Sequence, residues 1–130
     1  MSLYHYLVRL ETTLHSRQDI DVELLQFDIV TIGVQFRSEL RFYDGSHLSI
    51  VEQLESVGKQ DYKRIIYKYH YQDKDSNLIF RYDNSPHYPQ LYTFPAHKHV
   101  GSSVIEAEPP DLNDVLAEID AIIYPDVETK

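Results

Sequence analysis

The chain has 130 residues, a formal net charge of −9, 42% hydrophobic and 25% charged residues, and no cysteine. This composition predicts one soluble globular domain, and the lack of cysteine excludes disulfides and thiolate metal sites. No apolar run approaches the roughly 18 residues of a transmembrane helix and the start of the sequence lacks signal-peptide features, so we expect a cytoplasmic protein without a membrane partner.

The acidic net charge argues against broad nucleic-acid binding, but the charge is unevenly distributed. Residues 59–99 carry seven lysines and arginines against four acidic residues, whereas the segments before and after them are acidic. A locally positive site can attract phosphate on a protein that is negative overall.

The first elements are predicted from the spacing of apolar residues. Residues 2–16 have leucines at helical spacing behind Ser2, a suitable N-cap, and predict an amphipathic helix. Alternating patterns predict three strands at about 21–31, 36–43 and 48–54. Asp44-Gly45 favours a tight hairpin between the second and third strands, and Gly33 marks a turn or bulge.

The fourth and fifth strands, at 62–72 and 78–83, should form a hairpin with two different faces. The apolar face is predicted to carry Tyr67, Tyr69, Tyr71, Leu78, Phe80 and Tyr82. The polar face is predicted to carry Arg64, Lys68, His70, Arg81 and Asp83. A tight turn would place His70 opposite Ile79 and Lys68 opposite Arg81.

The remaining chain predicts a loop, a linker and a helix. Residues 84–96 are punctuated by prolines, which favour an ordered loop over a sheet strand. In the following His97-Lys98-His99, an extended backbone would direct both histidines the same way. Residues 100–108 form a linker with a candidate strand at 103–105, and the apolar stripe from Asp111 to Ile123 predicts the last helix.

The fold class that follows is α+β. We expect an antiparallel sheet of about five strands with the N-terminal and C-terminal helices packed on one face. Residues 1–124 should form the single domain, and residues 125–130 should form a frayed tail.

Titratable side chains concentrate between Tyr67 and His99, which hold four of the seven histidines and six tyrosines. Such a concentration favours a functional site. The acid–base candidates are His70, His87, His97 and His99, with Asp83 to orient a histidine or an arginine. The phosphate-binding candidates are Lys68, Arg81 and Lys98. These types suit metal-independent RNA cleavage, in which histidines transfer protons and cations hold the phosphate.

Three alternatives remain open for the same residues. His97 and His99, with His70, His87 or Asp83 nearby, could ligate a metal such as zinc, nickel or iron. The surface could instead be a non-catalytic module that binds a protein or a nucleic acid. Each side chain could also be structural, since tyrosine and histidine often fill contacts between strands and loops.

Three motifs stand out in the second half of the chain. They are Tyr69-His70-Tyr71-Gln72, Leu78 to Asn84 with Pro86-His87, and Thr93-Phe94-Pro95 with His97-Lys98-His99. With these motifs the chain resembles, over about residues 36–123, the TumE family of toxins from bacterial type II toxin–antitoxin pairs. Ala96 stands where the family often has a further histidine.

The resemblance implies a growth-inhibiting protein that is neutralised by a helix-turn-helix antitoxin encoded beside it. It supplies no catalytic set and no cofactor, so the ribonuclease hypothesis rests on the side-chain cluster alone. RNA is the expected substrate, and a homodimer is compatible with open sheet edges.

Overall fold

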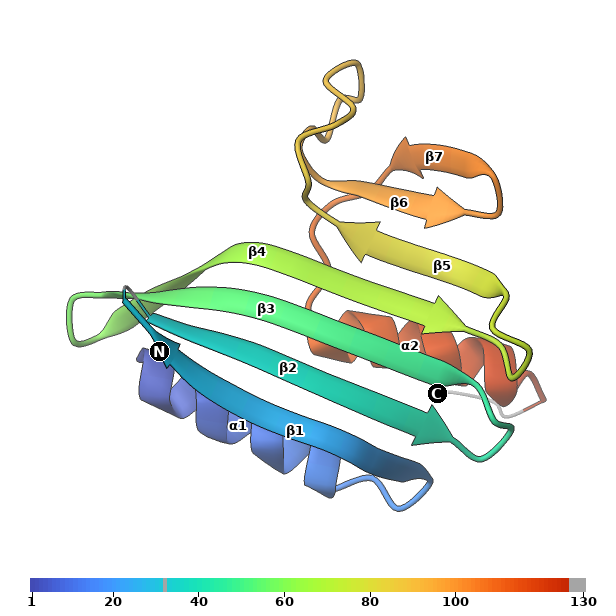
Figure 1. Ribbon diagram of the computed structural model, residues 1–130, viewed down its shortest axis with the longest axis horizontal. Helices are drawn as coiled ribbons and strands as arrows, with labels where there is room; N and C mark the ends of the chain where they lie inside the picture. The colour runs from blue at the N-terminus through green and yellow to red at the C-terminus, as the bar shows by residue number, and fades with distance from the viewer. Residues whose placement is uncertain (32, 127–130) are drawn as a thin grey trace.

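A computed structural model of the chain shows a twisted antiparallel sheet with two helices against one of its faces (Figure 1). The structure describes residues 1–31 and 33–126. The elements are α1 (Leu3–His15), β1 (Ile20–Val30), β2 (Gly33–Phe42), β3 (His47–Val57), β4 (Asp61–Gln72), β5 (Leu78–Asp83), β6 (His97–Val100), β7 (Ser103–Glu106) and α2 (Leu112–Ile123).

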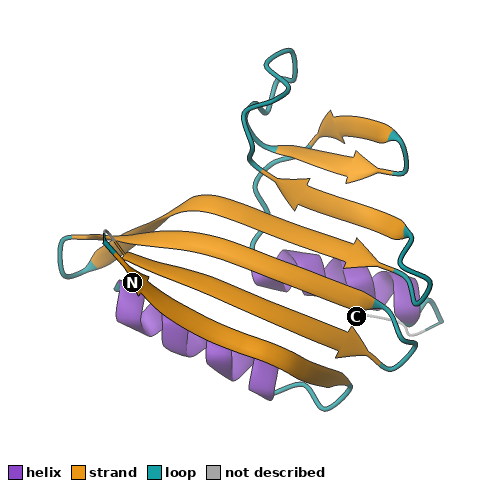
Figure 2. Cartoon of the chain, in the orientation of Figure 1, coloured by secondary structure: helices purple, strands orange, loops and turns teal. Residues whose placement is uncertain are grey.

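The sheet is a simple meander, in which each strand pairs with the next along the chain from β1 to β7. This confirms the α+β class and places both helices on one face, as Figure 2 also shows. The sheet has seven strands and not about five, because β6 and β7 extend it beyond β5. Both added strands have only four residues, and His97-Lys98-His99 lacks the apolar alternation by which a strand is recognised.

The core lies between the helices and the sheet. Ser2 caps α1 by accepting a hydrogen bond from the backbone N–H of His5, and Asp111 and Asp114 form a reciprocal capping box at α2. Each helix then buries its apolar side, and β1 to β5 supply the opposite wall of the core. The largest fully buried side chains from the sheet include Phe36, Tyr69, Tyr71 and Phe80.

The register between β4 and β5 differs from the predicted one. His70 pairs with Arg81 and not with Ile79, because Ile79 is an extra residue at a bulge and Leu78 pairs with Gln72. Leu78 therefore does not join the tyrosine face. The partner of His70 is two residues away from the predicted one. Because a shift by an even number of residues keeps each side chain on the same face, the polar and tyrosine faces remain separate as predicted.

A second bulge, between β3 and β4, reverses the direction of Arg64. Leu54 pairs with Arg64 and Gln53 with Ile66, so Ile65 is the extra residue. The sequence predicted Arg64 on the polar face, but its Nη1 donates to the hydroxyl of Tyr69 at 2.7 Å. Arg64 thus belongs to the helix side of the sheet.

The two glycines that were predicted to lie at turns do so in the structure. Gly45 has a φ of 85° in the β2–β3 turn, a conformation that favours glycine. Gly33 begins β2, where an added Cβ would lie 1.8 Å from the carbonyl oxygen of Leu54. In the predicted tail, residues 127–130 lie outside the described residues. None of the described helices is long and apolar enough to cross a membrane.

Candidate functional site

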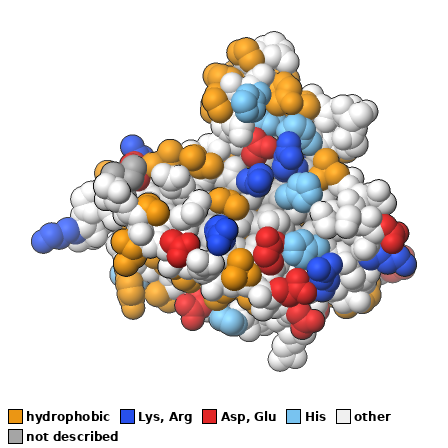
Figure 3. Space-filling view, in the orientation of Figure 1, with side chains coloured by type: hydrophobic (Ala, Val, Ile, Leu, Met, Phe, Trp, Pro, Cys, Tyr) orange, Lys and Arg blue, Asp and Glu red, His pale blue; other side chains and the backbone are white. Residues whose placement is uncertain are grey.

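The face of the sheet opposite the helices, here called the open face, carries the polar side chains of the central strands. Histidine, cationic and acidic side chains gather across it in the space-filling view (Figure 3). Their common direction follows from the register, since paired residues of an antiparallel ladder share a face. Four of them, on β5 and β6, contact one another and are called the Asp83 cluster. They are Arg81, Asp83, His97 and His99.

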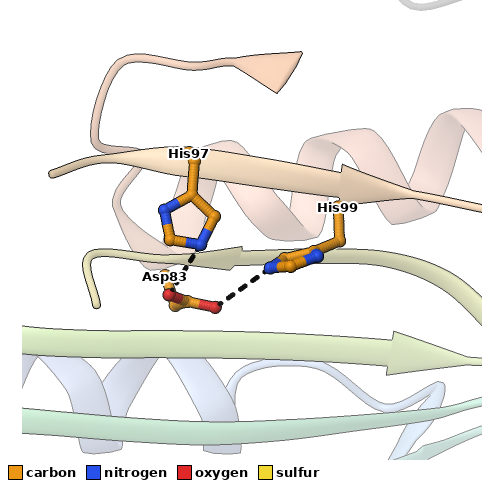
Figure 4. A group of neighbouring side chains, drawn as sticks. All are labelled: Asp83, His97 and His99. Carbon is orange, nitrogen blue, oxygen red and sulfur yellow. Dashed lines mark ion pairs between the residues drawn. The ribbon is translucent and has the colours of Figure 1, made fainter. Parts of the chain in front are cut away.

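Asp83 is the centre of this cluster, and only 7% of its side chain is exposed. Its Oδ1 lies 2.9 Å from Nε2 of His97 and accepts the N–H of Ser85 at 3.0 Å. Its Oδ2 accepts a hydrogen bond from Nε of Arg81 at 3.1 Å and lies 3.7 Å from Nε2 of His99. Figure 4 shows both imidazoles on β6 directed toward this carboxylate. These partners compensate the cost of burying the charge.

His97 lies beneath the surface, with 1% of its side chain exposed. Its Nε2 faces Asp83, and its Nδ1 lies 2.9 Å from the carbonyl oxygen of Pro95. A neutral imidazole has one N–H donor, so both contacts become hydrogen bonds only when the ring carries two protons. His97 therefore fixes Asp83 from the inside and does not reach the solvent.

His99 is held in the opposite hydrogen-bonding role. Nη2 of Arg81 lies 3.0 Å from Nε2 of His99, and because a guanidinium only donates, this nitrogen accepts. Burial lowers the pKa of His99, and the charge of Arg81 lowers it further, while Asp83 acts in the opposite direction. The lowered pKa of His99 favours the neutral form of the ring, which can accept a proton.

His70, Arg81 and His99 form a row across β4, β5 and β6. Adjacent strands lie about 4.8 Å apart, so the two imidazoles flank the guanidinium. Burial lowers the pKa of His70, and Arg81 lowers it further, against a hydrogen bond with Gln72 that raises it. The row can therefore place a bound anion between two groups capable of proton transfer.

The polar row continues toward β2 but changes sign. Ser49 pairs with His70 across β3 and β4, and its hydroxyl donates to Glu39 at 2.8 Å. Nε2 of His47 lies 3.2 Å from the other carboxylate oxygen of Glu39. The carboxylate of Glu39 disfavours phosphate, so an anion site is confined to β4, β5 and β6. His47 and Glu39 were not among the predicted site residues, because no local signal placed Glu39 in the same row as His70, or His47 beside Glu39.

The family can be assigned from a comparison with protein-family models. The model described as Toxin TumE matches residues 7–123. The chain belongs to the TumE toxin family. No significant match was found among curated proteins or among solved structures. The match confirms the predicted family and extends the similarity into the first 35 residues. Membership of the TumE toxin family implies a cognate antitoxin.

In this TumE-family chain, six of the eight predicted site residues share the open face. These six are the four residues of the Asp83 cluster, His70 and Lys68. Lys68 is exposed and pairs with Asp83 across β4 and β5. Lys68 therefore lies opposite Asp83 and not opposite Arg81 as predicted, and it adds a positive charge at the surface.

Two predicted residues are not brought to the site. Lys98 alternates with the two histidines of β6 and points to the helix side, where its Nζ contacts Glu118 of α2 at 2.7 Å. This corrects its predicted grouping with the phosphate-binding residues. His87 is exposed in the loop, and none of its described hydrogen bonds or ion pairs reaches the Asp83 cluster.

Tyr88 contacts the site but was not predicted. Its ring packs edge-on against His97 and His99, with centroid distances of 4.8 Å and 5.9 Å. Tyr88 thus covers one side of the Asp83 cluster. The available signal was its position between Pro86 and Pro89, which indicates an ordered loop but not the direction of the tyrosine.

A metal could be held by Asp83, His97 and His99, whose ligand atoms lie within 4.8 Å of one another. One carboxylate and two imidazoles suit zinc. The guanidinium of Arg81 contacts both Asp83 and His99 and opposes a second cation there. Metal binding therefore remains a prediction.

The histidine environments predict an NMR titration. In the wild-type protein, the C2 protons of His70 and His99 should titrate with midpoints below about 6.5, the ordinary value for histidine. Replacing Arg81 with methionine should raise the midpoint of His99, because a nearby positive charge is removed. Lys74→Met, in the β4–β5 turn, should leave both midpoints unchanged. A wild-type His99 midpoint above 6.5 would contradict the described arrangement.

Proposed function

We propose that the protein is a growth-inhibiting toxin that cleaves single-stranded RNA without a metal ion. The observation that supports this proposal is the row in which Arg81 stands between His70 and His99 on an uncovered sheet face. In the proposed complex, Arg81 holds the scissile phosphate in a bidentate contact and exposed Lys68 adds a second positive charge.

The reaction is an internal transesterification. One histidine of the flanking pair removes the proton of a ribose 2′-hydroxyl, and the oxygen attacks the adjacent phosphorus. The bond from phosphorus to the 5′-oxygen breaks, and the other histidine, protonated as the phosphate approaches, gives this oxygen its proton. The products are a 2′,3′-cyclic phosphate and a 5′-hydroxyl. Asp83 and His97 are positioning residues that hold Arg81 and the loop in place.

The partners follow from this function. The resemblance to TumE toxins supports a helix-turn-helix antitoxin encoded beside the gene, and an RNA substrate places the toxin in the cytoplasm. A homodimer through the sheet edges stays a prediction.

The test combines induced expression with a purified reaction. Wild-type protein should arrest growth and, in excess EDTA, convert RNA to fragments ending in 2′,3′-cyclic phosphate. His70→Gln, His99→Gln and Arg81→Met should each reduce the cleavage rate at least 100-fold. The controls are His87→Gln and Lys98→Gln, which change a histidine and a cation away from the row and should retain cleavage.

Two results would contradict the proposal. Intact RNA with sustained growth arrest in all variants would favour a module that blocks a partner without catalysis. Cleavage that requires an added metal would favour the metal-dependent alternative.

A further inference from the structure

A second site lies on the helix side of the sheet. A cavity of about 370 Å³, open to solvent on one side, lies between α1, the first residues of β4 and the N-terminal end of α2. This size is within the roughly 300–1,000 Å³ of small-molecule sites. The polar residues of its wall include Arg9, Tyr62, Lys63, Arg64, Asp111 and Asn113.

Two residues that line the cavity, Tyr6 and Arg64, belong to a buried hydrogen-bonded chain. Glu52 is fully buried and accepts the hydroxyls of Tyr6, at 2.6 Å, and of Tyr69. The Tyr69 hydroxyl in turn accepts Nη1 of Arg64 at 2.7 Å. The Arg64 guanidinium also stacks on the ring of Tyr67, with its central carbon 4.3 Å from the ring centroid. This chain holds Arg64 in one orientation.

Arg64 has hydrogen-bonding capacity left over. Within residues 1–31 and 33–126, its only hydrogen bond is the one from Nη1 to Tyr69, and the same nitrogen forms an ion pair with Glu52 at 3.9 Å. A guanidinium has five N–H donors, and none of the Arg64 nitrogens is among the buried atoms that lack a partner, so the remaining donors are accessible from the cavity. Because Arg64 lines the cavity, a ligand there can occupy its remaining donors in a bidentate contact.

The charges around the cavity indicate what kind of ligand fits. Arg9 and Lys63 add two positive charges to that of Arg64, and of these Lys63 also pairs with Glu55 at 3.4 Å and Arg64 with Glu52 at 3.9 Å. Asp111 and Asp114 place two carboxylates at the start of α2. One oxygen of each carboxylate is used in the capping box, and the other remains able to accept. A ligand with a dianionic head and a body rich in hydroxyl or amino donors matches both walls.

We propose that this cavity binds a small phosphomonoester with a polar body, of the nucleoside monophosphate class, and that Arg64 anchors its phosphate. The phosphate contacts Arg64, with Arg9 and Lys63 beside it. The body lies along Tyr62 and donates hydrogen bonds to Asp111 and Asn113. The site is on the opposite face of the sheet from His70, Arg81 and His99, so it is independent of the proposed RNA cleavage.

Calorimetry and two-dimensional NMR with adenosine monophosphate test this proposal on the full chain. We expect saturable binding, with amide shifts at Tyr62, Arg64 and Asn113, and at least tenfold weaker binding of adenosine and of inorganic phosphate. Arg64→Met should weaken binding of the nucleotide at least tenfold. Lys74→Met, which removes an exposed cation from the β4–β5 turn, should bind it like wild type.

A second variant tests the proposal if Arg64→Met fails to fold. Arg9 is exposed, so Arg9→Gln should keep the wild-type Tm and weaken binding about threefold or more. No binding by the wild-type protein, unchanged affinity in both variants, or shifts confined to the open face would each overturn the proposal.

Discussion

Replacing Asp83 with asparagine is expected to lower the free energy of unfolding by about 3 kcal/mol and to abolish RNA cleavage. Oδ1 of Asp83 faces two N–H groups, and Oδ2 accepts from Arg81. An asparagine amide would turn one acceptor into a donor, so His97 or Arg81 would meet an N–H group. The charge of Arg81 would also lose its buried partner. Urea denaturation measures the stability.

Asp75→Asn is the matched control, because Asp75 is exposed in the β4–β5 turn and its substitution should change stability by less than about 0.5 kcal/mol. His99→Gln separates catalysis from folding, since it should remove cleavage at a smaller cost in stability. If Asp83→Asn kept wild-type stability, the carboxylate would not be the centre of the cluster.

The elements of this fold could be predicted wherever the signal was local. The bounds of β5, residues 78–83, match those expected from alternation, and the capping residues of both helices lie where their side chains indicated. In each case, neighbours in the sequence determine the backbone. The candidate strand at 103–105 corresponds to β7, Ser103–Glu106, but β6 was not predicted. β6 is short and polar, and its pairing with β5 depends on the path of the intervening loop.

Bulges were the part of the sheet that alternation could not reveal. Ile65 and Ile79 are extra residues that arise from how neighbouring strands align, and each reverses the face of the residues beyond it. For this reason Arg64 appeared on the open face in the prediction but lies on the helix side. His70 and Arg81 were correctly predicted on one face, because the predicted pairing of the two strands was wrong by two residues, and an even shift does not change the face of a side chain.

The candidate site was predictable in residue type but not in grouping. The density of histidines pointed to β4, β5 and β6, and the alternation of a strand explains why His97 and His99 converge while Lys98 turns away. Proximity in the sequence had suggested that all three act together. Tyr88 was not foreseen because only the folded loop brings it against the imidazoles.

Replacing Glu52 with alanine should have the largest effect on stability, a loss of about 3–5 kcal/mol. The substitution leaves the hydroxyls of Tyr6 and Tyr69 without their acceptor and removes the ion-pair partner of Arg64 in the buried chain beside the cavity. Glu55→Ala is the control: Glu55 also pairs with a cation, Lys63, at 3.4 Å, but that lysine is exposed. Glu55→Ala should lower the free energy of unfolding by less than about 1 kcal/mol. Equal losses in both variants would contradict a structural role for the buried carboxylate.

Glu52→Gln isolates the charge of this carboxylate, because glutamine keeps one acceptor oxygen and nearly the same shape. Burial raises the pKa of Glu52, against the hydroxyls of Tyr6 and Tyr69, which lower it. Because the folded-state pKa is above the unfolded one, ionising Glu52 opposes folding as the pH rises from about 4.5. The stability of Glu52→Gln relative to wild type should therefore increase between pH 4.5 and pH 7.5. Urea denaturation at each pH measures this difference. A relative stability that falls with pH would mean that Tyr6, Tyr69 and Arg64 stabilise the carboxylate more than burial penalises it.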